Sequence, residues 1–495
     1  MKRLVVHCAL LTVLGSLYAA PPAGTDEKMI AVADDVKSTV ELFVNARTRG
    51  SADDFIVAVA KVKTMADAGQ TFYRFLLAVY AAQESLCGLS EEQRTRYLDE
   101  GRPLMWKHAE SGNALAQYLV GLDYEFNLGK ADEALRWFER AASAGQALAQ
   151  NSLGMKHYLG QGMPQNYAKA SEYFRKAALS ADMNGEYNLA AMYAEGQGVP
   201  KDDEMAFQLY KRAAEKGHSS AMNNLGWLYQ EGRGTDRNLK KAADWYQKAA
   251  ESGNPDGQFN YGFVCARGRG IPRNPRMASL WFWRAAEQGH LEAQVNLAQL
   301  YRDGMGIKRN DAKALEWFTK AAGQNHALAQ FFIGQMHESG RGTPQNDEQA
   351  FEWYKKSADQ NNPHGINALG TFHYRGKIVE KDYAQAEAFY RRAAEMGFPA
   401  AQNNLGMLYL RGESVTQDHA QAAEWFVKAV RQGSADATYN LAQLHEYGRG
   451  VERSHSRAAA LCRQAALKGH VGAAEWLAQK GYTAWAKEAE QADRE

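Results

Sequence analysis

Serine, histidine and glycine motifs are the parts of this sequence that could carry catalytic chemistry, and none of them is complete. No Ser-x-x-Lys and no Lys-Thr-Gly occurs, so the signature of the penicillin-recognising serine enzymes is absent. His337-Glu338 and His445-Glu446 begin like a zinc-protease motif but lack its second histidine. Triplets such as Gly160-Gln-Gly resemble part of a nucleotide-binding loop, yet they recur at a fixed interval, which indicates turns. We therefore predict no catalytic residue, no metal site and no cofactor.

The fixed interval belongs to a repeat that organises most of the chain. Equivalent residues lie 36 positions apart, and nine complete repeats span 145–468. A shorter repeat at 112–144 has 33 residues. The three residues by which it falls short of 36 are missing near Asn127. The first residue of each repeat is called offset 0 below. A period of this length predicts stacked supersecondary units that together bury one continuous core.

Each repeat is predicted to form two helices. Offsets 4, 8, 11 and 12 share one face of a first helix, which runs from about offset 1 to 14. Offsets 25, 28, 29, 32 and 33 share one face of a second helix; Ala fills offset 25 in all nine repeats, and offsets 28 and 29 are usually aromatic. Gly at offset 15, and at offset 17 in seven repeats, supplies the turn between them. The expected fold is all-α, a right-handed superhelical solenoid of stacked antiparallel helix pairs.

The junctions between helices require residues that tolerate a left-handed backbone. Glycine usually stands at offset 0, and Asn325 and Asn361, which replace it, are the next best suited. Ala181 is not suited, so we expect a distorted junction there. At offset 17, Ile378 and Ser414 replace glycine.

The two ends of the chain depart from the repeat. Residues 1–20 begin with Lys2-Arg3 and continue as an apolar run, which is typical of a secretory signal peptide; a buried N-terminal helix is the alternative. The predicted domains are the signal peptide at 1–20, an N-terminal helical pair that forms a cap at 21–68, a diverged repeat at 69–111, an array of ten repeats at 112–468, and a capping helix and tail at 469–495.

Charge and hydropathy limit the location and the partners. The chain has 58 Lys and Arg against 57 Asp and Glu, so its bulk charge does not attract nucleic acid or anionic membranes. No stretch after the signal peptide approaches the ~20 apolar residues of a membrane span. We predict a periplasmic or secreted protein with no nucleic-acid partner and no integral membrane span. Cys87, Cys265 and Cys462 would remain after cleavage; we interpret them as buried thiols, with disulfide pairing as the alternative.

Eight histidines fall at two offsets. His157, His337, His373 and His445 stand at offset 12, where other repeats carry tyrosine. This exchange indicates a half-buried ring with a polar tip. At offset 1, near a helix start, stand His218, His290, His326 and His470, which we interpret as surface residues.

The repeat resembles the Sel1-like repeat family, an α-α solenoid related to tetratricopeptide repeats. The segment Ser220-Ala-Met-Asn-Asn-Leu-Gly-Trp-Leu-Tyr-Gln-Glu-Gly-Arg-Gly matches the family pattern, as do Lys241-Ala-Ala-Asp-Trp-Tyr-Gln-Lys-Ala-Ala and Ala401-Gln-Asn-Asn-Leu-Gly-Met-Leu-Tyr. The resemblance covers 112–480 strongly. It implies a scaffold of the bacterial envelope. A cysteine-rich secreted branch has been associated with penicillin binding and β-lactamase activity, but no repeat here carries the cysteine pair of that branch.

The side of the first helix that faces away from the core is the predicted binding surface. At 100° per residue, offsets 3, 6, 7, 10 and 13 lie on that side, and in such solenoids the first helices line the concave surface. Several of these positions are aromatic, and offset 7 is Asn in six repeats. The predicted partner-binding residues are Trp227, Phe259, Phe263, Phe331, Phe332, Asn188, Asn224, Asn260 and Asn296. Exposed aromatic rings dominate protein interfaces, and Asn amides can bond an extended backbone. The alternatives are that these rings pack between repeats or form a contact between copies.

These observations favour a non-enzymatic scaffold that holds a protein or peptide on its concave face. One alternative is a β-lactamase-like or penicillin-binding hydrolase of the cysteine-rich branch, which the missing Ser-x-x-Lys argues against. A scaffold for binding or export of envelope polysaccharide is the other, because sugars also stack on aromatic rings.

Overall fold

The computed structural model describes residues 71–81 and 89–482, together with the isolated positions Val59, Val62, Lys63, Ala66, Ala484 and Trp485. The predicted signal peptide at 1–20, most of the predicted cap at 21–68, and Cys87 lie outside these residues. Throughout the described part the regular structure is helical, without a strand.

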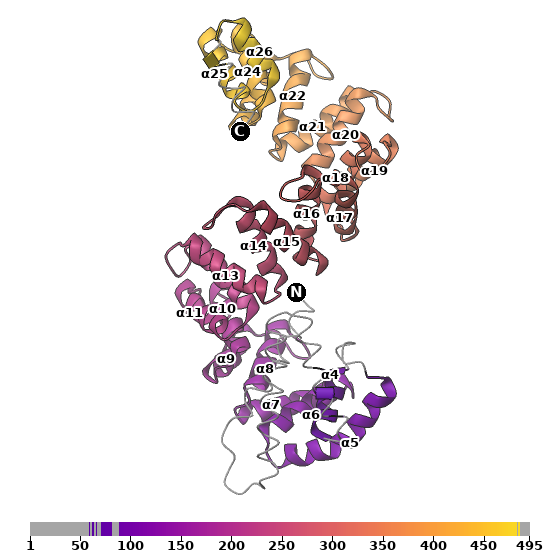
Figure 1. The fold of residues 1–495 in the computed structure, drawn as a ribbon, viewed down its shortest axis with the longest axis vertical. Coiled ribbons are helices and arrows are strands. Elements are labelled where there is room, and N and C mark those ends of the chain that lie inside the picture. The colour runs from indigo at the N-terminus through magenta and orange to yellow at the C-terminus, as the bar shows by residue number, and fades with distance from the viewer. Residues whose placement is uncertain are drawn as a thin grey trace. The chain divides into compact units, whose positions relative to one another are not determined.

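The helices follow one another in pairs (Figure 1). The first helices of the repeats are α6 (Ala114–Phe126), α8 (Ala147–Leu159), α10 (Met183–Glu195), α12 (Ser219–Glu231), α14 (Pro255–Arg267), α16 (Leu291–Asp303), α18 (Ala327–Ser339), α20 (Pro363–Arg375), α22 (Pro399–Arg411) and α24 (Ala435–Tyr447). The second helices are α7 (Ala131–Ser143), α9 (Tyr167–Leu179), α11 (Asp203–Glu215), α13 (Leu239–Glu251), α15 (Pro275–Glu287), α17 (Asp311–Gly323), α19 (Asp347–Asp359), α21 (Tyr383–Glu395), α23 (His419–Arg431) and α25 (His455–Ala466). Before them come α4 (Thr71–Ala81) and α5 (Glu91–Glu110), and α26 (Val471–Gln479) follows.

The chain divides into two compact halves, an N-terminal half that ends at His290 and a C-terminal half that begins at Leu291. Within each half, every described first helix packs against the second helix of its own repeat, and each second helix packs against the next first helix. The described helices therefore form an all-α repeat solenoid of stacked pairs, as the period predicted.

The helix boundaries of one repeat follow directly from its sequence. In the repeat that begins at Gly217, α12 covers offsets 2 to 14 and α13 covers offsets 22 to 34. Gly232 at offset 15 ends α12 in the left-handed conformation, with φ at 71°. The Asn238 side chain accepts the amide hydrogen of Lys241 and so caps the start of α13. The predicted extent of the first helix is thus confirmed, and the second helix contains the whole predicted face from offset 25 to 33.

A ring at offset 29 fills the core of the helix pair in eight of the nine complete repeats, Cys462 being the exception, and a small residue at offset 9 makes room for it. Tyr246 is 2% exposed, and a Cβ atom added to Gly226 would lie 2.8 Å from its ring. Phe282 and Gly262 form the same pair in the next repeat.

In the repeat that begins at Gly217 the neighbouring ring at offset 28 lies nearer the surface: Trp245 is half-buried, and the Lys248 ammonium lies 4.0 Å from its centroid. Trp281 and Trp317, at the same offset, are buried. The two adjacent aromatic positions therefore differ in role, which the pattern alone did not separate.

Five non-glycine residues adopt positive φ at the predicted junctions. Asn325 and Asn361 have φ of 63° and 58°, as expected for replacements at offset 0. Ala181 has φ of 59°, and α10 begins at the same offset as the other first helices. The expected distortion at Ala181 is therefore wrong: the junction keeps its geometry, and the alanine backbone is strained instead. Ile378 and Ser414 adopt φ of 69° and 72° at offset 17.

Candidate ligand-binding surface on the first helices

Most of the predicted asparagine row joins one repeat to the next. Asn188 on α10 donates its amide hydrogen to Asn151 Oδ1 on α8 at 2.8 Å, and Asn260 on α14 donates to Asn223 Oδ1 on α12 at 2.8 Å. The same bond joins Asn404 to Asn367 and Asn440 to Asn403. In every case offset 7 of one repeat meets offset 6 of the preceding repeat. These bonds fix neighbouring first helices side by side.

Two predicted asparagines lack this pairing because offset 6 of the preceding repeat is aromatic. Asn296 donates to the backbone carbonyl of Glu292 in its own helix at 2.7 Å. Asn224 hydrogen-bonds the hydroxyl of Tyr210 on α11. Contact of any of these asparagines with a ligand stays a prediction.

Aromatic residues at offset 6 make a second kind of contact between repeats. Tyr187 stacks on His218 with ring centroids 4.4 Å apart, and Phe259 stacks on His290 at 4.7 Å. In the C-terminal half, Tyr439 stacks on His470 in the same way, while Phe331 packs on His364 and Tyr354. The alternative of packing between repeats therefore describes the contacts of Phe259 and Phe331.

Three of the four histidines at offset 1 are helix caps. His218, His326 and His470 each accept the amide hydrogen of the residue three positions on, through Nδ1. His218 is 5% exposed, and burial lowers its pKa to about 4. The interpretation of this group as surface residues is therefore wrong for His218, which is buried and stacks on Tyr187 of the preceding repeat.

Phe332 packs inside the C-terminal half. Its ring lies 4.9 Å from Phe318 and 5.4 Å from Phe331, and the Arg302 guanidinium carbon lies 4.8 Å from its centroid. The ring is half-buried by these neighbours.

Trp227 and Phe263 differ from the other candidates because their described contacts are with arginine side chains. Both stand at offset 10, on α12 and α14, two first helices that contact each other. Trp227 is 39% exposed, and the Arg233 guanidinium carbon lies 4.9 Å from its ring centroid. Phe263 is half-buried and has two arginines over its ring, at 5.6 and 5.5 Å. These are Arg267 and Arg269, which the sequence analysis did not identify.

Arg233 is held by the preceding repeat. Its Nε donates to Asp203 Oδ2 at 3.1 Å, and Nη2 donates to the Ala194 carbonyl at 3.3 Å. The bond with Arg233 lowers the pKa of Asp203. Arg341 pairs with Asp311 in the same way three repeats further on. The ion pair therefore belongs to the way repeats are joined, and it fixes the guanidinium beside Trp227.

The nine predicted residues do not form one demonstrated cluster. Asn188, Asn224, Trp227, Phe259, Asn260 and Phe263 belong to the N-terminal half, and Asn296, Phe331 and Phe332 belong to the C-terminal half. Within the N-terminal half, Trp227 is the exposed member of the set, and half-buried Phe263 stands at the same offset of the neighbouring first helix with exposed Arg267 and Arg269 over its ring.

Other groups with potential chemistry have structural surroundings. Cys265 and Cys462 are buried free thiols, as predicted, and burial raises the pKa of both. The offset-12 histidines His157, His337, His373 and His445 are half-buried, as predicted. Desolvation lowers the pKa of His157 and His337. No group of three or more His, Cys, Asp or Glu side chains in the described part of the chain is arranged to hold a metal ion.

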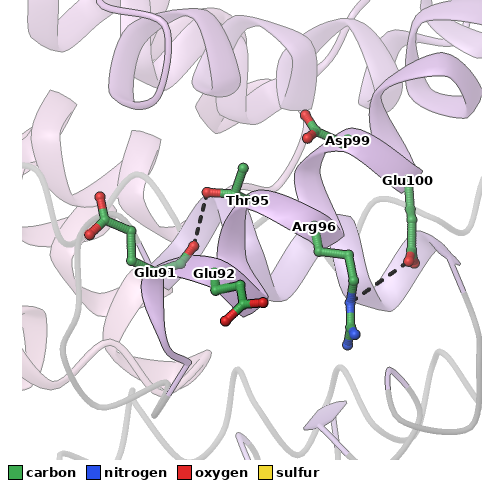
Figure 2. Close-up of a pocket in the computed structure, with 6 residues that line it drawn as sticks. All are labelled: Glu91, Glu92, Thr95, Arg96, Asp99 and Glu100. Atoms are coloured by element: carbon green, nitrogen blue, oxygen red, sulfur yellow. Dashed lines mark hydrogen bonds and ion pairs between the residues drawn. The ribbon is translucent and has the colours of Figure 1, made fainter.

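Figure 2 shows a shallow depression along α5. It is lined by Glu91, Glu92, Thr95, Arg96, Asp99 and Glu100. The Thr95 hydroxyl donates to the Glu91 carbonyl, and Arg96 Nε lies 3.8 Å from Glu100 Oε1. These contacts lie within a single helix, and the depression holds no arrangement of an acid, a base and a nucleophile.

The repeat model of one family matches the chain ten times in succession. The Sel1 repeat matches residues 114–146, 147–182, 184–218, 219–254, 255–290, 291–326, 327–362, 363–398, 399–434 and 435–470. The chain belongs to the Sel1 repeat family. It is therefore a Sel1 repeat scaffold protein, and its helix pairs are Sel1 repeats.

A solved structure supports this assignment. A protective antigen present in uropathogenic Escherichia coli strains, which displays an SLR fold, is 35% identical; the match covers 78% of this chain and 83% of that chain, with a TM-score of 0.65. A Sel1 repeat protein from Oxalobacter formigenes is 34% identical over 62% of this chain and 90% of its own, with a TM-score of 0.49. No curated protein matches the chain. None of the described helices combines the length and the apolar character needed to cross a bilayer.

Proposed function

We propose that this Sel1 repeat protein is a non-enzymatic scaffold of the periplasm or the secreted space, which binds a protein or peptide on the face of its first helices. We take this face to be the concave one. The observation that carries the proposal is the exposure of Trp227 on a face whose candidate rings at offsets 6 and 7 pack against neighbouring repeats; Phe263 stands at the same offset of α14, a first helix that contacts α12. Exposed large aromatics flanked by arginine are the residue types that dominate binding energy in protein interfaces.

Two observations support a periplasmic or secreted location. The first is the charged and then apolar order of residues 1–20, which is typical of an exported protein. The second is the likeness to a protein described as a protective antigen of uropathogenic Escherichia coli. Fractionation of the native cell, with detection of the chain in periplasm, medium and cytoplasm, tests the location; accumulation in the cytoplasm would contradict it.

The variant Trp227→Ser/Phe263→Ser tests the binding face. The immobilised protein and the variant are each exposed to extract from the native envelope, and captured proteins are identified by mass spectrometry. We expect the variant to lose specific capture while its melting temperature stays close to that of the parent, because Trp227 is 39% exposed. A melting temperature lower by many degrees, with capture unchanged, would show that the two rings serve packing.

An assay for hydrolysis separates the scaffold from the alternative enzyme. The purified protein is expected to leave nitrocefin intact, because its sequence has no Ser-x-x-Lys. Turnover above the buffer background would place the protein among hydrolases instead.

A further inference from the structure

We propose that the segment bound by α12 and α14 is acidic, and that Arg267 and Arg269 recognise its carboxylates while Trp227 and Phe263 take its apolar side chains. This inference rests on the proposed function and names the chemistry of the partner. The surface formed by these four residues and Arg233 is called the Trp227–Phe263 surface below.

The charge of this surface is not neutralised by the described part of the chain. Arg233 is paired with Asp203, but neither Arg267 nor Arg269 forms an ion pair with a described residue. Glu231 ends α12, accepts a hydrogen bond from Gln230, and forms no ion pair with either arginine. Two positive charges therefore remain available beside an apolar ring.

The arginines are also placed in a way that suits carboxylate binding. Each has its guanidinium carbon about 5.5 Å from the Phe263 centroid, so the ring restrains both side chains before a ligand arrives. A guanidinium group donates two parallel hydrogen bonds to one carboxylate, which makes arginine the preferred residue for recognising Asp and Glu. Restrained donors lose less conformational entropy on binding.

This combination does not recur at the equivalent places of other repeats. In the repeat of α20, Arg375 and Lys377 occupy the offsets of Arg267 and Arg269. That repeat has Thr371 in place of the ring at offset 10, and its Lys377 forms an ion pair with Asp347. In the repeat before α14, offset 14 is Glu231. The presence of two unpaired arginines and a ring in one repeat therefore indicates a local binding role, beyond the requirements of stacking.

Fluorescence anisotropy with three labelled peptides tests the inference. The first alternates Glu with Trp and Leu, and the second and third carry Gln or Lys in place of every Glu. The purified full chain is expected to bind the Glu peptide about tenfold or more tightly than the Gln peptide, and to bind the Lys peptide most weakly. Binding of the Glu peptide should weaken as salt is added.

Charge reversal identifies the residues responsible. The variant Arg267→Glu/Arg269→Glu is expected to bind the Glu peptide about tenfold or more weakly than the parent does, and to bind the Lys peptide more tightly. The control Arg175→Glu/Lys355→Glu makes the same change in net charge at exposed positions of α9 and α19 and should retain the preference for Glu. Circular dichroism should show the same helix content and melting temperature for all three proteins, because neither pair of residues forms ion pairs in the fold.

Several outcomes would overturn the inference. Equal binding of the Glu and Gln peptides, or loss of the preference in the control variant, would show that Arg267 and Arg269 do not select acidic segments. Binding of polygalacturonate in place of the Glu peptide would identify a saccharide as the occupant. If no peptide binds while Trp227→Ser/Phe263→Ser still loses its captured partner, the proposed function stands and the acidic specificity fails.

Discussion

Replacing His218 with asparagine tests how a buried cap couples the stability of α12 to pH. Burial lowers the pKa of His218 from 6.5 to about 4, and its Nε2 has no hydrogen-bond partner. The folded protein therefore keeps a neutral imidazole at a pH where the unfolded chain already gains a proton. The stability that the protein gains by burying the neutral His218 ring is fully present above pH 6.5 and is lost as the pH falls toward 4. At about 1.4 kcal/mol per pKa unit, the free energy of unfolding falls by about 3 kcal/mol over this pH range.

Hydrogen exchange of peptides from α12, corrected for the intrinsic effect of pH on exchange, measures this loss. The parent protein should show weaker protection at pH 5 than at pH 7. His218→Asn should remove that difference, because Asn254 already caps α14 by accepting the Gly257 amide hydrogen at 2.7 Å. The control His326→Asn, at the same offset in the C-terminal half, should leave the acid-dependent loosening of α12 in place. Unchanged pH dependence of α12 in His218→Asn would refute the assignment of the effect to this cap.

Three further predictions concern stability and are measured by chemical denaturation. Gly226→Ala should destabilise the protein by about 1–3 kcal/mol, because the added Cβ would lie 2.8 Å from the Tyr246 ring. In the control Gly323→Ala the added Cβ meets nothing within 4 Å, so this variant should be more stable by at most about 1 kcal/mol. Equal effects of the two substitutions would contradict the packing of Tyr246 against Gly226. Ile378→Gly should stabilise by about 1 kcal/mol by relieving positive φ, and a loss would contradict the strain. Asn260→Ala should cost about 1 kcal/mol through its lost bridge between α12 and α14, and unchanged stability would contradict that role.

The helices could be predicted from the sequence because the period and the local chemistry of helix ends act over a few residues. Gly232 ends α12 and Asn238 begins α13, and both signals can be identified without any knowledge of the fold. The same holds for Asn325, whose side chain makes a left-handed junction tolerable.

Contacts between repeats were harder to predict, because a period shows which residue recurs but not which residue of the next repeat it meets. Asn188 bonds Asn151 across 37 positions, one more than the period, and Tyr187 meets His218 across 31. A signal was nevertheless present in the sequence. Where offset 6 is Asn, offset 7 of the following repeat is Asn; where offset 6 is Tyr187, Phe259 or Tyr439, offset 1 of the following repeat is His.

The arginines of the candidate surface were missed for a different reason. Arg267 ends α14 four residues after Phe263, on the same helical face, but the prediction from the sequence considered only aromatic and asparagine residues on that face; Arg269 lies in the turn after the helix. The contact of Arg267 with Phe263 is therefore a local one, whereas the contact of Arg269 depends on the course of the turn after α14.

Site-specific photocrosslinking at position 263 tests the Trp227–Phe263 surface most directly. A photoreactive phenylalanine analogue replaces Phe263 in one sample and the exposed Lys355 in another, and both proteins are irradiated in extract from the native envelope. The account predicts a crosslink to another protein from position 263 alone, mapped by mass spectrometry to a segment rich in Asp and Glu. Crosslinks from position 263 that stay within the chain, or equal crosslinking from both positions, would contradict it.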